Sequence, residues 1–299
     1  MTSSTVLVTG GSARIGAAIV QAFADNAWHV VIHYGESHDE AEALASTLPS
    51  AETVHCDLAD GDAAVTMVEA LAARLPDWRC LVNCAAIFEP DAVTELDPAT
   101  NLRSMQINAR TPARMAQAYL AHARAAAGRR VIQFTDQKLA NPNPDFFSYT
   151  MSKHAADATI RMLAMGAARA EDRIYGLAPG AILASHDQSE DEAERSHLLN
   201  LRRRRTTPED VAQAAVMLAR GDLASGETLF VGEDIGGIEE YLSRLTQALW
   251  GAMALVMLLG LAGGLYISRR VEAAMGQLNR VVQAVQEGDL QQRAVIRHS

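Results

Sequence analysis

The sequence is short of cysteine, aromatic residues and basic residues. Its three cysteines, Cys56, Cys80 and Cys84, are too few for a disulfide framework. Cys80 and Cys84 have no further Cys or His at the spacing of a zinc site, so no metal centre is expected. Aromatic residues make up only 5% of the 299 residues, but 49% are hydrophobic, which is the composition of a folded protein.

The shortage of basic residues excludes one class of partner. The 26 basic residues against 36 acidic ones give a formal net charge of −10, which argues against a nucleic-acid surface because phosphate contacts need a basic patch. Only two of the 26 are lysines, Lys138 and Lys153. A position that holds lysine in such an arginine-rich chain is a candidate for a role that needs an amine.

No charged residue occurs in the 21-residue run 248–268. A helix of that length spans roughly 31 Å, the thickness of the hydrocarbon core of a bilayer. Trp250 and Tyr266 lie near its ends, and Arg269 and Arg270 follow directly. We expect a transmembrane helix that attaches the chain to a membrane, and the alternative is a buried helix of a soluble protein.

The start MTSSTVLVTG lacks the basic region and the long apolar run of a secretion signal, so the N-terminal domain is expected in the cytoplasm. The arginine pair after the apolar run would place residues 269–299 in the cytoplasm as well. One membrane crossing cannot satisfy both expectations, so the topology stays open. The conflict suggests that the two parts did not evolve as one topology.

A strand, a glycine-rich turn and a helix follow one another at the N-terminus. The β-branched run 5–8 precedes TGGSARIG, an apolar-periodic helix comes next, and a second strand is expected over 28–34. The glycines permit a tight turn, and the first turn of the helix offers unpaired N–H groups to a pyrophosphate. The segment therefore predicts a dinucleotide site.

The end of the second strand indicates which dinucleotide. The chain reads His33-Tyr34-Gly35-Glu36-Ser37, without the acid directly after the strand that binds the ribose in NAD-dependent enzymes. Arg14 in the glycine loop has the geometry to bind a 2′-phosphate, which favours NADPH. Glu36 counts against this prediction, and Arg14 as an exposed loop charge is the alternative.

Strand signals alternate with helices through the rest of residues 1–233. The expected strands are 5–8, 28–34, 53–55, 80–82, 130–134, 172–177 and 228–231, and the expected helices include 61–75, 99–126, 149–166 and 208–220. Seven strands separated by helices predict an α/β fold of the Rossmann type, with a doubly wound parallel sheet. Ligands of such folds bind at the carboxyl ends of the strands.

Tyr149 and Lys153 lie four residues apart, one turn of a helix from each other. A lysine beside a tyrosine stabilises the phenolate, and we expect it to lower the pKa of Tyr149 toward neutrality. A phenol tuned in this way is a general acid suited to the reduction of a carbonyl or imine.

With this pair, the sequence resembles the short-chain dehydrogenase/reductase family over residues 4–233. The pattern Thr9-Gly10-x-x-x-Arg14-x-Gly16, and then Asp57, Asn83, Asn108 and Pro179-Gly180, match in order and spacing. The resemblance implies that Tyr149 donates a proton, Lys153 holds the nicotinamide ribose and Asn108 supports a proton relay. The implied NADPH contacts are Thr9, Gly10, Arg14, Ile15, Gly16, His33, Tyr34, Ser37, Asp57, Leu58, Asn83, Ala85, Lys153, Pro179 and Gly180.

Three departures from the common family pattern resemble the pteridine and dihydromonapterin reductases. They are Arg14 in place of a middle glycine, His33-Tyr34 at the end of the second strand, and Asp136 where most members have serine. The resemblance implies a dihydropterin substrate, with Phe88 stacked on the pterin and Asp136 paired with Tyr149. The alternatives are a core aromatic for Phe88 and a turn or capping residue for Asp136.

The C-terminal part has a different character. After a junction at 234–247 and the membrane segment, residues 269–299 resemble part of a HAMP linker, with apolar positions at Val271, Met275, Leu278, Val282 and Val285. The charged segment 185–205 is expected to form a mobile loop and helix over the substrate. The resemblance to the reductase family implies a homo-oligomer formed through helices 99–126 and 149–166. Two alternative functions stay open: a reductase of another carbonyl compound, and a membrane-anchored signalling fragment that senses a nucleotide.

Overall fold

The structure is a computed structural model that describes residues 4–142, 144–182, 205–232 and 236–287. The chain divides into two compact units, Met1–Gly236 and Gly237–Ser299. The domain boundaries predicted at 233, 247 and 268 stay predictions. The loop predicted over 185–205 lies, apart from Arg205, outside the described residues.

The first unit contains one seven-stranded parallel sheet, and the predicted fold class is confirmed. The strands are β1 (Thr5–Val8), β2 (His29–Tyr34), β3 (Ala51–His55), β4 (Trp78–Asn83), β5 (Arg130–Phe134), β6 (Arg173–Pro179) and β7 (Thr228–Val231). Their order across the sheet is β3-β2-β1-β4-β5-β6-β7. Successive strands are added on one side of β1 up to β3 and on its other side from β4 onward. Doubly wound sheets open a crevice for a ligand at such a point, here between β1 and β4.

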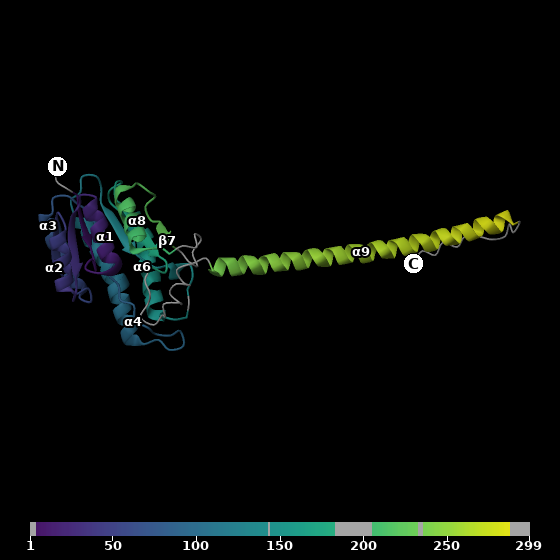
Figure 1. The fold of residues 1–299 in the computed structure, drawn as a ribbon, viewed down its shortest axis with the longest axis horizontal. Helices are drawn as coiled ribbons and strands as arrows, with labels where there is room; N and C mark the ends of the chain where they lie inside the picture. Colours follow the sequence, from purple (N-terminus) through teal and green to yellow (C-terminus); the bar gives the residue numbers. More distant parts are fainter. Residues whose placement is uncertain (1–3, 143, 183–204, 233–235, 288–299) are drawn as a thin grey trace. The chain divides into compact units, whose positions relative to one another are not determined.

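Helices cover both faces of the sheet (Figure 1). The helices are α1 (Arg14–Asp25), α2 (His38–Thr47), α3 (Gly61–Arg74), α4 (Pro98–Met105), the π-helix η1 (Gln106–Arg110), α5 (Thr111–His122), the 3₁₀ turn η2 (Gln137–Leu139), α6 (Phe147–Gly166), α8 (Pro208–Arg220) and α9 (Gly236–Gln286). Helix α1 packs against α8, and α3 packs against α5. In β1, Val6 and Val8 face the first pair and Leu7 faces the second. This double burial explains the uninterrupted apolar run of the strand.

Three helices differ from the prediction. The expected helix 99–126 consists of α4, η1 and α5, and the π-helix interrupts the regular hydrogen bonding at Asn108. Helix α2 was not predicted, because Ala41 is the one residue that it buries and it therefore has almost no apolar periodicity. Helix α9 runs continuously through the boundary expected at 268.

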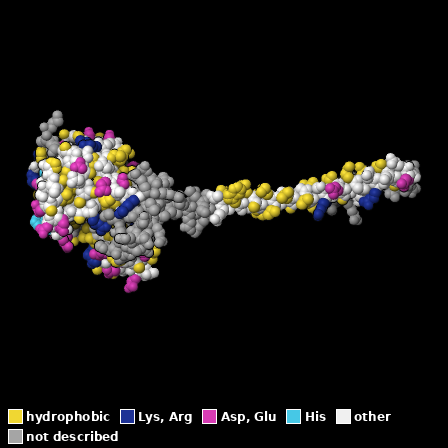
Figure 2. All heavy atoms as spheres, viewed as in Figure 1, with side chains coloured by type: hydrophobic (Ala, Val, Ile, Leu, Met, Phe, Trp, Pro, Cys, Tyr) yellow, Lys and Arg dark blue, Asp and Glu magenta, His cyan; other side chains and the backbone are white. Residues whose placement is uncertain are grey.

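Within α9, Thr246–Gln286 is long and apolar enough to cross a membrane. The predicted membrane segment 248–268 lies inside this range. Figure 2 shows hydrophobic side chains along the first part of the helix and basic side chains farther along it. The large apolar side chains there, among them Leu249, Leu258 and Leu265, are exposed. Apolar exposure of this extent is what a helix surrounded by lipid requires.

We predict that Gly16→Ala destabilises the first unit. A Cβ atom at Gly16 would clash with the Gly10 carbonyl oxygen, because α1 begins in close contact with the glycine turn. The free energy of unfolding should fall by about 1–3 kcal/mol, measured by urea denaturation. Gly166→Ala is the control, since a Cβ atom at Gly166 meets no neighbour within 4 Å. Equal loss of stability in both variants would contradict the prediction.

Candidate functional site

The carboxyl ends of the strands bring most of the predicted residues to one edge of the sheet. Thr9 follows β1, Tyr34 ends β2, Asn83 ends β4, Asp136 follows β5 and Pro179 ends β6. All the strands are parallel, so these ends lie at the same edge, as expected for a ligand site of this fold.

The first turn of α1 has no side-chain cap on its backbone N–H groups. Its N-cap residue, Ala13, offers no side-chain hydrogen bond, and the first turn contains no acidic residue. By contrast, Asp60, Asp97 and Thr207 cap the starts of α3, α4 and α8 with their side chains. The N–H groups of α1, which include those of Ile15 and Gly16, therefore fit a pyrophosphate.

Residues around this turn differ in what they offer a ligand. Arg14 is exposed and holds the left-handed backbone conformation, with φ of 53°. Ser37 directly precedes α2, and its side chain makes no capping hydrogen bond to that helix. The Tyr34 hydroxyl lies 2.8 Å from His38 Nδ1. A guanidinium and a hydroxyl of this kind suit a phosphate group.

His33 lies behind the glycine turn instead of facing a ligand. Its side chain is only 2% exposed. Nδ1 accepts a hydrogen bond from the Gly10 N–H at 3.2 Å, and Nε2 lies 3.0 Å from the Cys56 carbonyl oxygen. Burial lowers the pKa of His33 to about 4 and outweighs the opposing effect of the Cys56 bond. This geometry lets a neutral His33 position Gly10, and a direct cofactor contact of His33 stays a prediction.

Thr9 and Asn83 also bind the protein itself. Thr9 Oγ1 accepts hydrogen bonds from the N–H groups of Cys84 at 3.0 Å and Ala85 at 3.1 Å. Asn83 is buried, and its Nδ2 donates to Gln133 Oε1 at 2.8 Å and to the Pro112 carbonyl at 3.2 Å. Both side chains therefore fix the loop after β4 at the predicted site.

The remaining predicted cofactor residues lie at the ends of β3 and β6. Asp57 is exposed and its carboxylate accepts from the Ala59 N–H at 2.8 Å, whereas Leu58 is buried. Pro179 is buried, and the Gly180 N–H donates to the Val231 carbonyl at 2.8 Å. A Cβ atom at Gly180 would clash with the Gly232 carbonyl, so only glycine fits there.

The predicted acid and carboxylate are in direct contact. The Tyr149 hydroxyl donates to Asp136 Oδ2 at 2.6 Å, and the Lys138 N–H donates to Asp136 Oδ1 at 2.9 Å. Lys153 is buried beside them, with its Nζ donating to the Phe134 carbonyl at 2.9 Å. Asp136 and Tyr149 are thus hydrogen-bonded to each other, and Lys153 lies beside them with its ammonium bonded to the end of β5.

The acidity of Tyr149 differs from the prediction. Burial raises the pKa of Tyr149 well above its usual value, and the charge of Asp136 and its hydrogen bond act in the same direction. Burial lowers the pKa of Lys153, against the opposing effects of Asp136 and Cys84. Lys153 Nζ lies 5.5 Å from the centroid of the Tyr149 ring. Burial is the larger cause and the adjacent carboxylate adds to it, so both favour the protonated form of Tyr149.

Asn108 connects the π-helix to the loop after β4. Its Oδ1 accepts from the Ile87 N–H at 2.8 Å, and its Nδ2 donates to the Ile87 carbonyl at 2.9 Å and to Ser152 Oγ at 3.0 Å. A π-helix inside an α-helical run often marks a functional site. Here it turns Asn108 inward, so that both backbone groups of Ile87 are fixed directly before Phe88.

Phe88 has a second aromatic neighbour that the sequence did not indicate. It meets Tyr149 edge to face, with ring centroids 4.6 Å apart, and it stacks on Phe146 at 3.9 Å. At 40% exposure Phe88 is not a core residue. Phe146 directly precedes α6 and lies far along the chain from Phe88, so no local sequence pattern links the two rings.

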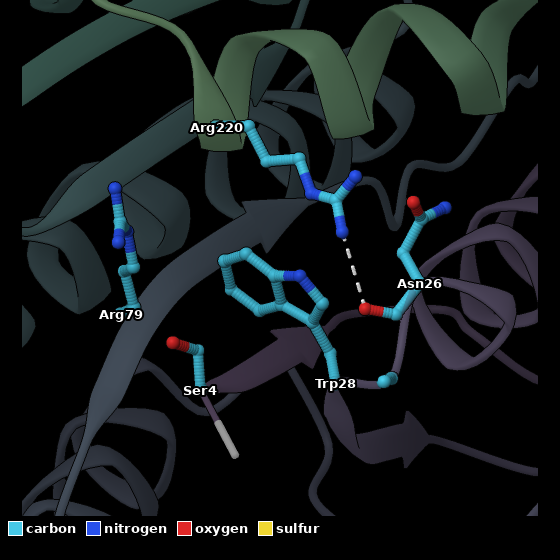
Figure 3. Close-up of a pocket in the computed structure, with 6 residues that line it drawn as sticks. Ser4, Asn26, Trp28, Arg79 and Arg220 are labelled. Atoms are coloured by element: carbon cyan, nitrogen blue, oxygen red, sulfur yellow. Dashed lines mark hydrogen bonds between the residues drawn. The ribbon is translucent and has the colours of Figure 1, made fainter. Parts of the chain in front are cut away.

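A separate cavity lies at the other edge of the sheet (Figure 3). Ser4 and Trp28 directly precede β1 and β2, and Arg79 is near the start of β4, so this cavity is remote from the carboxyl ends. Arg220 donates to the Asn26 carbonyl at 3.3 Å, which places a cation at the C-terminus of α1. Such a charge stabilises a helix end, and this explains the arginine without a ligand.

We predict that His33 makes stability depend on pH. The unfolded chain binds a proton at His33 below its usual pKa of 6.5, and the folded chain does so only near pH 4. Acidification between these values should therefore lower the free energy of unfolding, by roughly 3 kcal/mol at most from this residue. Urea denaturation at several pH values should show a weaker dependence in His33→Gln. The exposed His154, replaced by Gln, is the control, and an unchanged slope in His33→Gln would contradict the prediction.

Comparison with known proteins places the first unit in a family. The model described as enoyl-(acyl carrier protein) reductase, which represents short-chain dehydrogenases/reductases, matches residues 11–233. The chain is 27% identical over 210 residues to dihydromonapterin reductase of Citrobacter koseri, covering 68% of this chain and 83% of that protein. It is 27% identical over 228 residues to pteridine reductase 1 of Leishmania tarentolae, covering 62% and 79%.

A solved structure agrees with these matches. The FolM alternative dihydrofolate reductase 1 from Brucella canis, complexed with NADP, superimposes with a TM-score of 0.72 and 30% sequence identity, covering 78% of this chain and 94% of that chain. The HAMP resemblance of residues 269–299 receives no support from these comparisons. Because the family model matches most of this chain, the chain belongs to the short-chain dehydrogenase/reductase family of oxidoreductases.

Proposed function

We propose that this protein is an NADPH-dependent reductase of a dihydropterin of the dihydromonapterin, dihydrobiopterin or dihydrofolate type. The observation that carries the proposal is the hydrogen bond of 2.6 Å from Tyr149 to Asp136, beside the exposed ring of Phe88. A carboxylate bonded to the acid, together with an aromatic wall, suits a flat heteroaromatic substrate that takes up a proton on nitrogen. The names of the relatives support the same substrate class.

The residues around the glycine turn fit NADPH. The uncapped first turn of α1 would hold the pyrophosphate, and Arg14 and Ser37 would hold the 2′-phosphate. Lys153, whose ammonium keeps donors beyond the one on Phe134, would hold the nicotinamide ribose. NADP in the Brucella protein supports this assignment. When bound, this cofactor supplies the hydride that reduces the substrate.

Tyr149 and its neighbours perform the proton transfer. With the hydride supplied to the carbon of the substrate C=N double bond, the nitrogen would take the proton of the Tyr149 hydroxyl, which would be left as a phenolate. Asp136 orients that hydroxyl, and the Lys138 N–H fixes Asp136 in turn. Asn108 acts indirectly, because it fixes Ile87 and hence the position of Phe88. A reductase of another carbonyl compound would use the same acid, so a substrate panel separates the two functions.

We predict that Tyr149→Phe lowers kcat for dihydropterin reduction by a factor of about 10²–10⁴, because the proton donor is lost. The Kd for NADPH should stay within about threefold, because the hydroxyl does not bind the phosphates. Initial rates of NADPH oxidation and a binding titration measure the two effects. Tyr175→Phe is the control, since its hydroxyl bonds to the Leu223 carbonyl at 3.0 Å, away from Asp136. Undiminished turnover in Tyr149→Phe would remove the proposed mechanism.

We further propose that α9 attaches the enzyme to a membrane, with the reductase unit on its cytoplasmic side. A chain that ends at Gly236 keeps the whole of the first compact unit. It should remain in the supernatant after ultracentrifugation, whereas the full chain should sediment with membranes. Its kcat/KM should equal that of the full chain within about twofold. Loss of activity or of a nucleotide response on truncation would favour the signalling alternative.

A further inference from the structure

Phe88 and Phe146 form an aromatic pair at the candidate site. Their centroids are 3.9 Å apart and their planes are 13° from parallel. Phe146 thus covers one face of Phe88, and yet 40% of Phe88 remains exposed. Tyr149 also meets Phe88 edge to face, and the part of the ring that remains exposed is a surface on which another flat ring can stack.

Polar anchors fix the chain on both sides of Phe88. Asn108 binds the N–H and the carbonyl of Ile87, the residue before it. Three residues after it, the Asp91 carboxylate accepts from the Ser148 N–H at 2.9 Å and from the Ser148 hydroxyl at 2.5 Å. Asp91 thereby ties this loop to the first turn of α6, directly beside Phe146.

The backbone of Phe146 has an unfavourable conformation for this residue type. Its φ of 56° and ψ of 50° lie in the left-handed region, where asparagine or glycine is favoured over phenylalanine. Its carbonyl accepts from both the N–H and the hydroxyl of Thr150 at 2.9 Å. A strained residue that the surrounding structure holds in place is a common feature of ligand sites. The backbone conformation gives no reason for a phenylalanine here, so we attribute the choice of this residue to its ring.

The Phe146 ring also lies under a cation. The Nζ atom of Lys138 is 5.8 Å from its centroid, within the range of a cation–π interaction. Lys138 is the residue whose N–H fixes Asp136. Lys138 belongs to the short turn η2, which therefore contacts both the Phe146 ring and the Asp136 carboxylate.

We propose that Phe146 is a positioning residue for substrate binding: it holds the plane of Phe88 so that the pair accepts a flat heteroaromatic ring and selects against non-planar carbonyl compounds. This inference rests on the proposed pterin reductase function. A lone Phe88 would rotate about its side-chain bonds and would lose that freedom on binding. The stacked partner removes the freedom beforehand, which strengthens the binding of a planar substrate.

The test compares Phe146→Asn with Phe146→Tyr in the full chain. Asparagine suits the left-handed backbone, so the first variant removes the ring without a loss of stability, whereas the second keeps the ring. For Phe146→Asn we expect KM for dihydrobiopterin to rise about three- to tenfold, which is the cost of ordering the freed Phe88 side chain on binding, expressed as affinity. Its kcat, its KM for NADPH and its KM for an aliphatic ketone should change less than about twofold. Phe146→Tyr should behave as the parent.

The outcomes separate this inference from the proposed function. Equal KM values for dihydrobiopterin in the parent and in Phe146→Asn overturn the inference. An equal rise in KM for the ketone, or a lower thermal midpoint of unfolding in Phe146→Asn, also overturns it, because either result indicates a structural role. If the parent binds biopterin in a fluorescence titration but does not turn a dihydropterin over, the proposed function fails. The ratio of the biopterin Kd of Phe146→Asn to that of the parent then still decides the role of Phe146. A parent that binds no biopterin overturns both.

Discussion

Burial of the central strands from both faces is the constraint on which the site depends. Val6, Leu7 and Val8 of β1 are fully buried, with helices packed on each side of the sheet. Polar side chains cannot point into either face without losing their hydrogen bonds to water. Polar side chains therefore gather mainly where the strands end, and the parallel arrangement puts all the carboxyl ends at one edge. The position of the chemistry therefore follows from the apolar sequence of the strands.

At that edge, many polar side chains bind the backbone of another element and leave the ligand to others. His33 holds the turn at Gly10, Thr9 holds the loop after β4, and Asn108 holds Ile87. Each is a side chain with both donor and acceptor capacity, which a buried backbone segment needs if its N–H and carbonyl groups are to be satisfied. The result is a rigid frame around the few groups that remain for a ligand: the first turn of α1, Tyr149 and Phe88.

The sequence predicted the parts of this arrangement that depend on local pattern. The central strands were found because double burial makes them largely continuous apolar runs, and the turn at Gly10 was found from its glycines. Tyr149 and Lys153 were found because a helix fixes their separation. The roles of His33 and Phe146 depend on contacts with segments far along the chain, for which one sequence contains no signal. The π-helix at Asn108 has no distinctive composition either, and α2 lacks the periodicity that reveals an amphipathic helix.

The same limit explains why the acidity of Tyr149 was predicted in the wrong direction. Spacing places Lys153 one helical turn away, but the ammonium donates to the Phe134 carbonyl, and its distance to the centre of the Tyr149 ring is 5.5 Å. Asp136 is in direct contact with the hydroxyl and stabilises its protonated form. Burial of the hydroxyl is the larger cause, and the charge and hydrogen bond of Asp136 raise the pKa of Tyr149 in the same direction. Burial and Asp136 therefore act together to keep the proton on Tyr149, whereas Lys153 donates to the Phe134 carbonyl instead.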